Sequence, residues 1–129
     1  MIHNIYVISS SGEPIVTIKL GSIEASEALV SGFLSAIQSF SKQLVGSEIQ
    51  EVTTGTLNML MRRVDQVLVA IAVDPGDNDA RRRLDEITRV IHNHLGKTKP
   101  ASLKQMLTEV ATKEVTALDR GMLWVERGM

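Results

Sequence analysis

The sequence lacks cysteine altogether and contains few aromatic residues and prolines. Without cysteine, the 129 residues can form neither a disulfide framework nor a thiolate metal site, which fits a reducing environment. No apolar run approaches the roughly 20 residues of a membrane-spanning helix, and no basic region followed by a hydrophobic core marks a signal peptide. We therefore expect a soluble, cytoplasmic protein without an integral membrane segment.

An excess of charge of one sign is missing too, because 14 basic and 15 acidic residues give a formal net charge of −1. This balance provides no electrostatic footprint for nucleic acid. Arg81-Arg82-Arg83 is the one locally basic stretch, and acidic residues on both sides of it indicate a solvated helix face. The alternative for these arginines is contact with an acidic partner or with phospholipid head groups, which would allow peripheral membrane association.

Patterns that indicate catalysis or metal binding are absent as well. His92 and His94 stand two residues apart, so on a helix they point about 200° apart and cannot share a metal as an i, i+4 pair would. None of the glycines forms a phosphate-binding loop that ends in Lys-Ser or Lys-Thr. His3 has no nucleophile motif around it. We expect no enzyme activity, no cofactor and no metal.

The first twenty residues predict a β-hairpin. Two runs rich in β-branched residues, Ile2–Ile8 and Pro14–Leu20, flank a polar loop that contains glycine, which is typical of adjacent antiparallel strands. Pro14 cannot donate a ladder hydrogen bond and Lys19 resists further pairing, so the second strand should lie at or near a sheet edge. The edge at Ile18 and Lys19 is a first candidate for partner binding.

A long helix should follow, from Ser22 as its N-cap to Val45, with Gly46 as its stop. Spacing of three and four residues predicts one buried face, made of Leu29, Phe33, Ala36, Ile37, Phe40 and Leu44. Val30 and Leu34 flank that face and widen the apolar arc beyond what one sheet face needs. They indicate either a broad core face or a helix that also meets a partner, and they are the second candidate for partner binding.

The middle of the chain predicts three short strands, and the C-terminal part predicts two helices. Strands are expected at Ile49–Val52, Leu57–Met61 and Val67–Val73, and the last shows no polar alternation, as in a central strand covered on both faces. Helical spacing extends over Asp79–Leu95 and again over Ala101–Leu118. Because hairpins join sequential strands as neighbours, the order β-β-α-β-β-β-α-α predicts an α+β fold. Its five-stranded antiparallel sheet should carry the long helix on one face and the last two helices on the other.

Residues 119–129 form a tail after a single domain that spans residues 1–118. The tail contains the only tryptophan, within the apolar cluster Met122-Leu123-Trp124-Val125. A tryptophan can bury on the order of 150–250 Å², so its surroundings matter. The cluster either continues the final helix and docks on its own domain, or enters a groove of a partner. Met122, Leu123 and Trp124 are the third candidate for partner binding, and deletion of residues 119–129 should leave the fold intact.

The arrangement of residues 1–118 resembles a longin domain. The stretch "IYVISSSGEPIVTIKL" is similar to the opening of longin and adaptor small-chain domains, where a strand ends in a polar glycine turn before its partner. The related roadblock domain shares the sheet but begins with a helix, whereas Ile2 here already lies in a strand. The resemblance implies a non-catalytic platform that dimerises and binds small GTPases, SNARE helices or trafficking subunits, including other longin or roadblock subunits.

Three classes of function stay open on the sequence alone. The favoured hypothesis is a protein-interaction module that forms dimers, as homodimer or heterodimer, and acts as a scaffold or regulator for a small GTPase or for vesicle-trafficking machinery. The alternative is a small-molecule sensor that resembles PAS or GAF domains, which a ligand cavity would distinguish. An enzyme is the third, and the lack of a convergent acid, base or nucleophile speaks against it.

Overall fold

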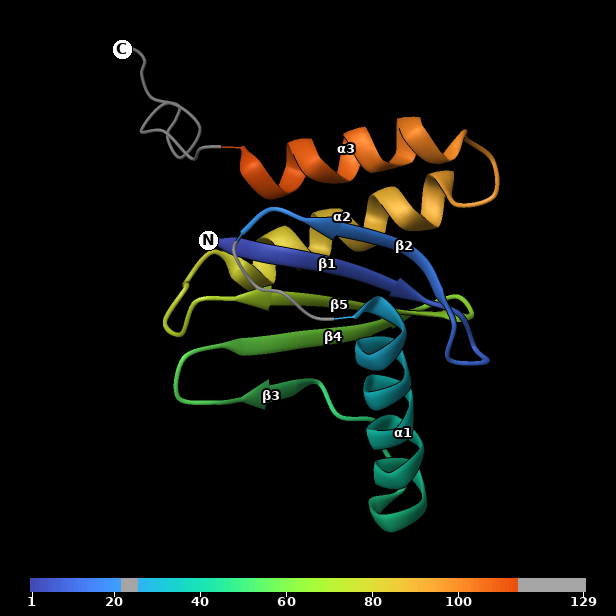
Figure 1. Ribbon diagram of the computed structural model, residues 1–129, viewed down its shortest axis with the longest axis vertical. Helices are drawn as coiled ribbons and strands as arrows, with labels where there is room; N and C mark the ends of the chain where they lie inside the picture. The colour runs from blue at the N-terminus through green and yellow to red at the C-terminus, as the bar shows by residue number, and fades with distance from the viewer. Residues whose placement is uncertain (22–25, 114–129) are drawn as a thin grey trace.

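The computed structural model describes residues 1–21 and 26–113, which form one sheet between two layers of helix (Figure 1). The strands are β1 (Ile2–Ile8), β2 (Pro14–Lys19), β3 (Glu51–Thr53), β4 (Asn58–Val64) and β5 (Val67–Val73). The helices are α1 (Glu27–Val45), α2 (Ala80–His94) and α3 (Pro100–Thr112). Within these described residues, none of the helices has the length and hydrophobicity that crossing a bilayer requires.

The sheet has the strand order β2-β1-β5-β4-β3, and every neighbouring pair is antiparallel. All seven residues of β5 are buried, which confirms the prediction that Val67–Val73 is the central strand. Its lack of polar residues follows from its position, because helices cover it on both faces. β2 lies at one edge of the sheet, as Pro14 and Lys19 predicted, and the short β3 lies at the other.

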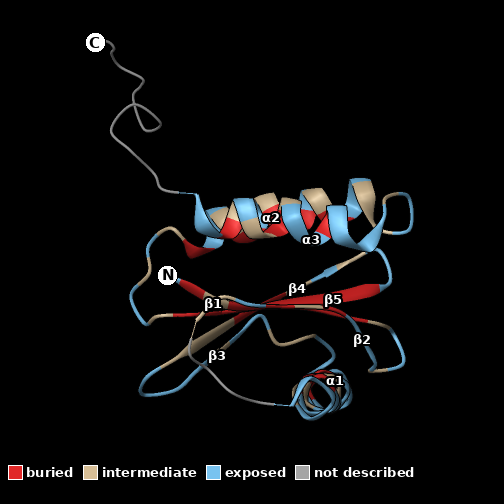
Figure 2. Cartoon of the chain, turned by 45° about the horizontal axis from the view of Figure 1, so that its top comes forward, coloured by how far each residue is buried: buried red, intermediate tan, exposed pale blue. Residues whose placement is uncertain are grey.

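Helix α1 covers one face of the sheet, and α2 and α3 cover the other, as predicted (Figure 2). Alternation along β1 directs Ile5 and Val7 to the α2–α3 side, and Tyr6 and Ile8 to the α1 side. The core on the α2–α3 side is the larger of the two, and its helical part consists of Ala80, Leu84, Ile87, Ile91, Leu103, Leu107 and Ala111. On the other side Leu34 is the only fully buried apolar side chain that α1 contributes.

Several predicted boundaries differ from those in the structure. Strand β4 continues through Arg62 and Arg63, beyond the predicted end at Met61, because both residues pair with β5. Helix α1 has Ser26 as its N-cap, with the Leu29 N–H donating to Ser26 Oγ over 3.3 Å, so Ser22 is not the cap. Ser22 itself, and the predicted extension of the last helix to Leu118, lie outside the described residues.

The end of α1 follows the prediction. Gly46 has φ 78°, a left-handed conformation that glycine adopts without steric cost, and its N–H donates to the Lys42 carbonyl over 2.9 Å.

The first turn of α2 and the last turn of α3 are joined by an ionic network. Both Arg82 and Arg83 donate to the Asp79 carboxylate, with Arg82 Nε 2.7 Å from Oδ1 and Arg83 Nε 2.9 Å from Oδ2. Arg83 also donates to the carbonyl of Ala111, and through Nη2 to the carbonyl of Lys113 over 2.7 Å. The guanidinium of Arg83 therefore satisfies carbonyls that the end of α3 leaves without helical partners. This contact places the end of α3 beside the start of α2.

We expect this network to make the protein lose stability in acid. The hydrogen bonds from Arg82, followed by those from Arg83, hold the pKa of Asp79 well below its usual value. A carboxylate with a lowered pKa in the folded state stabilises the fold above its unfolded pKa of about 3.9, and this contribution is lost as the pH falls below that value. Allowing for solvent screening, Asp79→Asn should lower the free energy of unfolding by about 1 kcal/mol at neutral pH.

Urea unfolding at several pH values tests this expectation. Asp79→Asn should show a shallower decline of stability below about pH 4 than the wild type. Asp85→Asn is the matched control, because Asp85 pairs with Arg62 on the exposed surface and should contribute little. An acid decline that is identical in wild type and Asp79→Asn would contradict the assignment.

Candidate interaction surface on helix α1

The apolar stripe of α1 faces solvent. Leu29, Phe33, Phe40 and Leu44, hereafter the α1 stripe, expose 71%, 58%, 64% and 68% of their surface. The prediction that these four side chains form the buried face is therefore wrong. Ala36 is exposed as well, and Ile37 alone of the predicted face is half-buried. These side chains form an exposed apolar row on a helix that packs on the sheet. Such a row indicates a protein-interaction surface.

The side of α1 that faces the sheet is largely polar. Its buried residues are Ser31, Leu34, Gln38 and Ser41. Leu34 is 1% exposed, so the prediction that it provides surplus surface is wrong, and Val30 is half-buried beside it. Leu34 therefore holds α1 on the sheet, and of the predicted pair only Val30 retains an accessible surface.

The hydrogen bonds of Gln38 explain why a polar residue lies on the side of α1 that faces the sheet. Its Nε2 donates to the Ile49 carbonyl over 2.7 Å, and its Oε1 accepts from the Ile49 N–H over 2.6 Å. Ser41 Oγ donates in the same way to the Ser47 carbonyl over 2.7 Å. These side chains satisfy backbone groups of the segment that leads into β3, in which Ile49 is half-buried. The apolar pattern of the sequence did not reveal this role. The signal that could have indicated it is the row of polar residues Ser31, Gln38 and Ser41, which share one side of α1 with Leu34.

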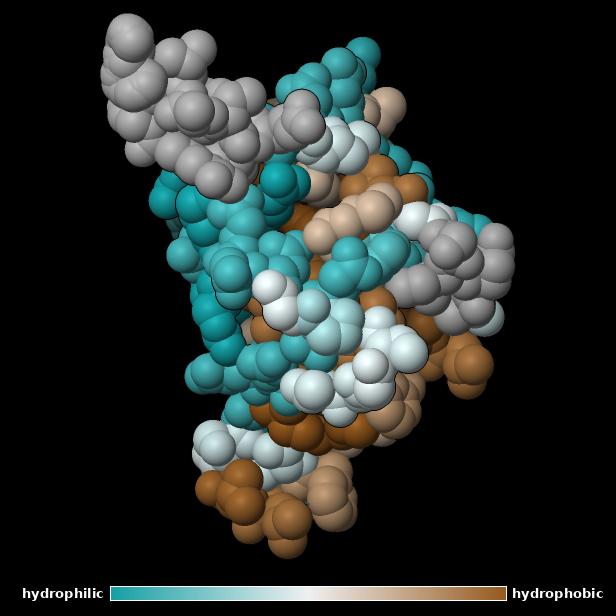
Figure 3. All heavy atoms as spheres, turned by 90° about the vertical axis from the view of Figure 1, so that its left-hand side faces the viewer, coloured by the Kyte–Doolittle hydropathy of each residue, from teal (hydrophilic) through white to brown (hydrophobic). Residues whose placement is uncertain are grey.

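The position of α1 explains the exposure of its C-terminal half. Figure 1 shows that the helix crosses the sheet and continues beyond β3, the edge strand. Phe40, Leu44 and Val45 lie in this part of α1, and each is more than half exposed. In Figure 3 hydrophobic residues gather at the lower end of the molecule, where this part of α1 projects. No strand of the described residues lies beneath these side chains, so the described part of the chain leaves them in solvent.

A groove runs between the N-terminal half of α1 and the β3 edge. It has a volume of about 420 Å³, and its lining is apolar: Leu29, Val30, Phe33, Leu34, Val52 and Met59. Val52 belongs to the edge strand β3, so one side of the groove carries backbone groups that a neighbouring chain could pair with. The α1 stripe, this α1–β3 groove and the β3 edge form one continuous candidate surface.

The other residues that the sequence suggested for partner binding differ in their accessibility. β2 is an edge strand as predicted, but the side chain of Ile18 is buried in the core on the α2–α3 side and is not accessible to a partner. Lys19 at the end of β2 is exposed. Met122, Leu123 and Trp124 lie outside the described residues.

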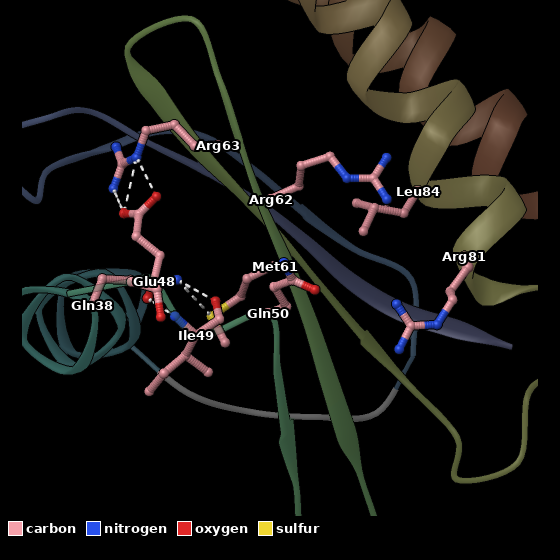
Figure 4. Close-up of a pocket in the computed structure, with 10 residues that line it drawn as sticks. Gln38, Glu48, Ile49, Gln50, Met61, Arg62, Arg63, Arg81 and Leu84 are labelled. Atoms are coloured by element: carbon pink, nitrogen blue, oxygen red, sulfur yellow. Dashed lines mark hydrogen bonds and ion pairs between the residues drawn. The ribbon is translucent and has the colours of Figure 1, made fainter. Parts of the chain in front are cut away.

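A second, polar cleft of about 320 Å³ lies between β4, α2 and the segment before β3 (Figure 4). Three arginines line it, and each pairs with a carboxylate: Arg62 with Asp85, Arg63 with Glu48, and Arg81 with Glu51. The hydrogen bonds from Arg63 hold the pKa of Glu48 below its usual value. Because each of these three guanidinium groups is paired with a carboxylate, they offer no free positive charge to an anion. The ion pairs of Arg62 and Arg63 instead link β4 to α2 and to the segment before β3.

Comparison with known proteins bears on the fold. Neither a protein-family model nor a curated protein matches the sequence. Solved structures do match: a Roadblock/LC7 domain from Streptomyces avermitilis has a TM-score of 0.59 at 10% identity, covering 74% of this chain and 86% of its own. The chain has the longin/roadblock fold.

Two structures of MglB also share the longin/roadblock fold. MglB from Myxococcus xanthus has a TM-score of 0.53 at 14% identity, covering 71% of this chain and 81% of its own. A structure described as MglB with a tetrameric arrangement has a TM-score of 0.51 at 11% identity, covering 84% of this chain and 79% of its own. Identities this low establish the longin/roadblock fold alone.

Proposed function

We propose that this chain is a non-catalytic interaction module that forms a dimer through α1 and the β3 edge and acts as a scaffold or regulator for a small GTPase. The exposed α1 stripe carries this proposal. Four large apolar side chains remain in water although the helix that bears them is packed on the sheet. A second copy would bury the same stripe on both chains, as two-fold assemblies do.

A small GTPase is the partner class that the longin resemblance implies, and vesicle-trafficking machinery is the wider setting. The match to MglB in a tetrameric arrangement supports self-association of this fold. The alternative of a PAS-like or GAF-like sensor is less favoured, because the α1–β3 groove is lined by apolar side chains alone and offers no polar side chain to orient a small ligand. We infer a cytoplasmic location from the composition.

Partner capture in two nucleotide states tests the GTPase proposal. Immobilised protein is incubated with lysate of the source cells in the presence of either GDP or a non-hydrolysable GTP analogue with magnesium. We expect one small GTPase to be enriched in one nucleotide state over the other, because regulators distinguish the two switch conformations. The isolated protein should itself bind neither nucleotide by calorimetric titration.

Two outcomes would contradict the proposal. Saturable, tight binding of GTP by the isolated chain would overturn its role as a non-catalytic module. Enrichment of proteins that are not small GTPases, equally with both nucleotides, would reject the GTPase as partner while leaving the dimer to be tested separately by light scattering.

A further inference from the structure

A second groove lies on the opposite side of the molecule from α1, between α2 and α3. It has a volume of about 530 Å³. Its apolar lining comes from Val90 of α2 and from Met106 and Val110 of α3, and all three side chains are half-buried. Glu86 and Glu109 also line it, so the apolar centre has an acidic border. The remaining lining residues, Thr112 and Lys113, are the last described residues of the chain.

The segment that follows Lys113 therefore starts at the groove itself. Arg83 donates to the carbonyl of Lys113, which holds this exit point against α2. From Lys113 back to Met106, α3 covers about 10 Å at 1.5 Å per residue. The eight residues 114–121 can span up to about 26 Å when extended, so the apolar cluster Met122–Val125 can reach every part of the groove. The connection also contains Gly121, which permits a sharp change of direction.

We propose that Met122–Val125 docks into the α2–α3 groove of its own chain. The length of the connection and the apolar lining favour this pairing. The charges beside the apolar cluster balance, since Asp119 and Glu126 accompany Arg120 and Arg127. Glu86 already pairs with Arg82, so Glu109 is the groove carboxylate that can accept a hydrogen bond from a tail arginine. The apolar side chains of the cluster then cover Val90, Met106 and Val110. The groove is thus a binding site whose ligand is the C-terminal segment.

The α1–β3 groove is the competing site on this chain. It lies on the opposite face of the sheet from α3, so the tail would have to pass around a sheet edge to reach it (Figure 2). Its lining is entirely apolar side chains, which offer the two tail arginines no acidic partner. Proximity therefore favours the α2–α3 groove, because the described chain ends at that groove.

Trp124 reports directly on the proposal, because it is the only tryptophan in the chain. In the intact protein we expect its fluorescence emission to be shifted to shorter wavelength than that of free tryptophan, with acrylamide quenching reduced several-fold. Met106→Glu should shift the emission towards the solvent value and restore quenching. Met106 is half-buried and lies at the groove, so the domain should tolerate the change, which far-UV circular dichroism verifies. Val110→Glu is the second variant if Met106→Glu fails to fold.

Phe33→Glu is the matched control, since it introduces the same charge into the other groove. It should leave the emission of Trp124 unchanged. A solvent-like emission in the wild type would overturn the proposal, as would a shift caused by Phe33→Glu and not by Met106→Glu. Protection that disappears on dilution would place the tail in the groove of a second copy and would overturn docking within one chain. Deletion of residues 119–129 should retain the cooperative thermal transition, because the sheet and helices of the described residues already bury two cores between them. Loss of the transition would show that Trp124 belongs to the core instead.

Discussion

Replacing both Phe33 and Phe40 by glutamate should abolish self-association while leaving each chain folded. Both side chains are more than half exposed on α1, so the fold itself does not depend on them. In a two-fold dimer each change is made twice. Burial of four phenylalanines contributes about 6–12 kcal/mol as an upper estimate, at about 1.5–3 kcal/mol each. Loss of about 4 kcal/mol of this contribution should weaken the dimer roughly a thousandfold.

Multi-angle light scattering on the intact chain measures this effect at about tens of micromolar, where weak dimers persist. The wild type should elute with the mass of a dimer and the double variant with the mass of one chain. Ser39→Glu is the control, because Ser39 is an exposed residue of α1 outside the stripe, and it should remain dimeric. A monomeric wild type at this concentration would reject the α1 interface.

Leu34→Ala should greatly lower the free energy of unfolding of each chain, whereas the double phenylalanine variant should lose the dimer and keep the fold. Leu34 is 1% exposed and packs in the smaller core with Tyr6, Ile8 and Met61. Truncating a buried leucine to alanine removes its transfer free energy and leaves a cavity, at a cost of about 2–5 kcal/mol. The loss should lie towards the upper part of this range, because α1 contributes no other fully buried apolar side chain to this core.

Chemical unfolding of Leu34→Ala and Leu44→Ala provides a matched pair on one helix. Leu44 is 68% exposed, so its truncation should change the stability of the monomer by less than about 0.5 kcal/mol. Both changes are best made in the Phe33→Glu, Phe40→Glu background, which removes any contribution of the dimer. Equal losses in the two variants would mean that the assignment of the buried and exposed sides of α1 is wrong.

Local patterns were sufficient for the elements and for the sheet. The unbroken apolar run Val67–Val73 indicated a strand buried on both faces, and Pro14 indicated an edge; both positions are confirmed. Hairpin connections then restricted the neighbours of each strand. Strand ends were less accurate, because β4 was predicted to end at Met61 although cross-strand pairing with β5 continues through Arg62 and Arg63.

The sequence by itself determined the order of the elements, the central strand and the existence of an apolar stripe on α1. Only the tertiary structure decided which side of α1 meets the sheet. Helical periodicity places apolar side chains on one face but does not say what covers that face. Here the backbone of Ile49 requires hydrogen-bond partners, and Gln38 supplies them only if the polar side of α1 turns inward. Leu34 completes the contact. The α1 stripe is exposed because it lies on the side of α1 that is turned away from the sheet, and the C-terminal half of α1 also extends beyond the sheet edge.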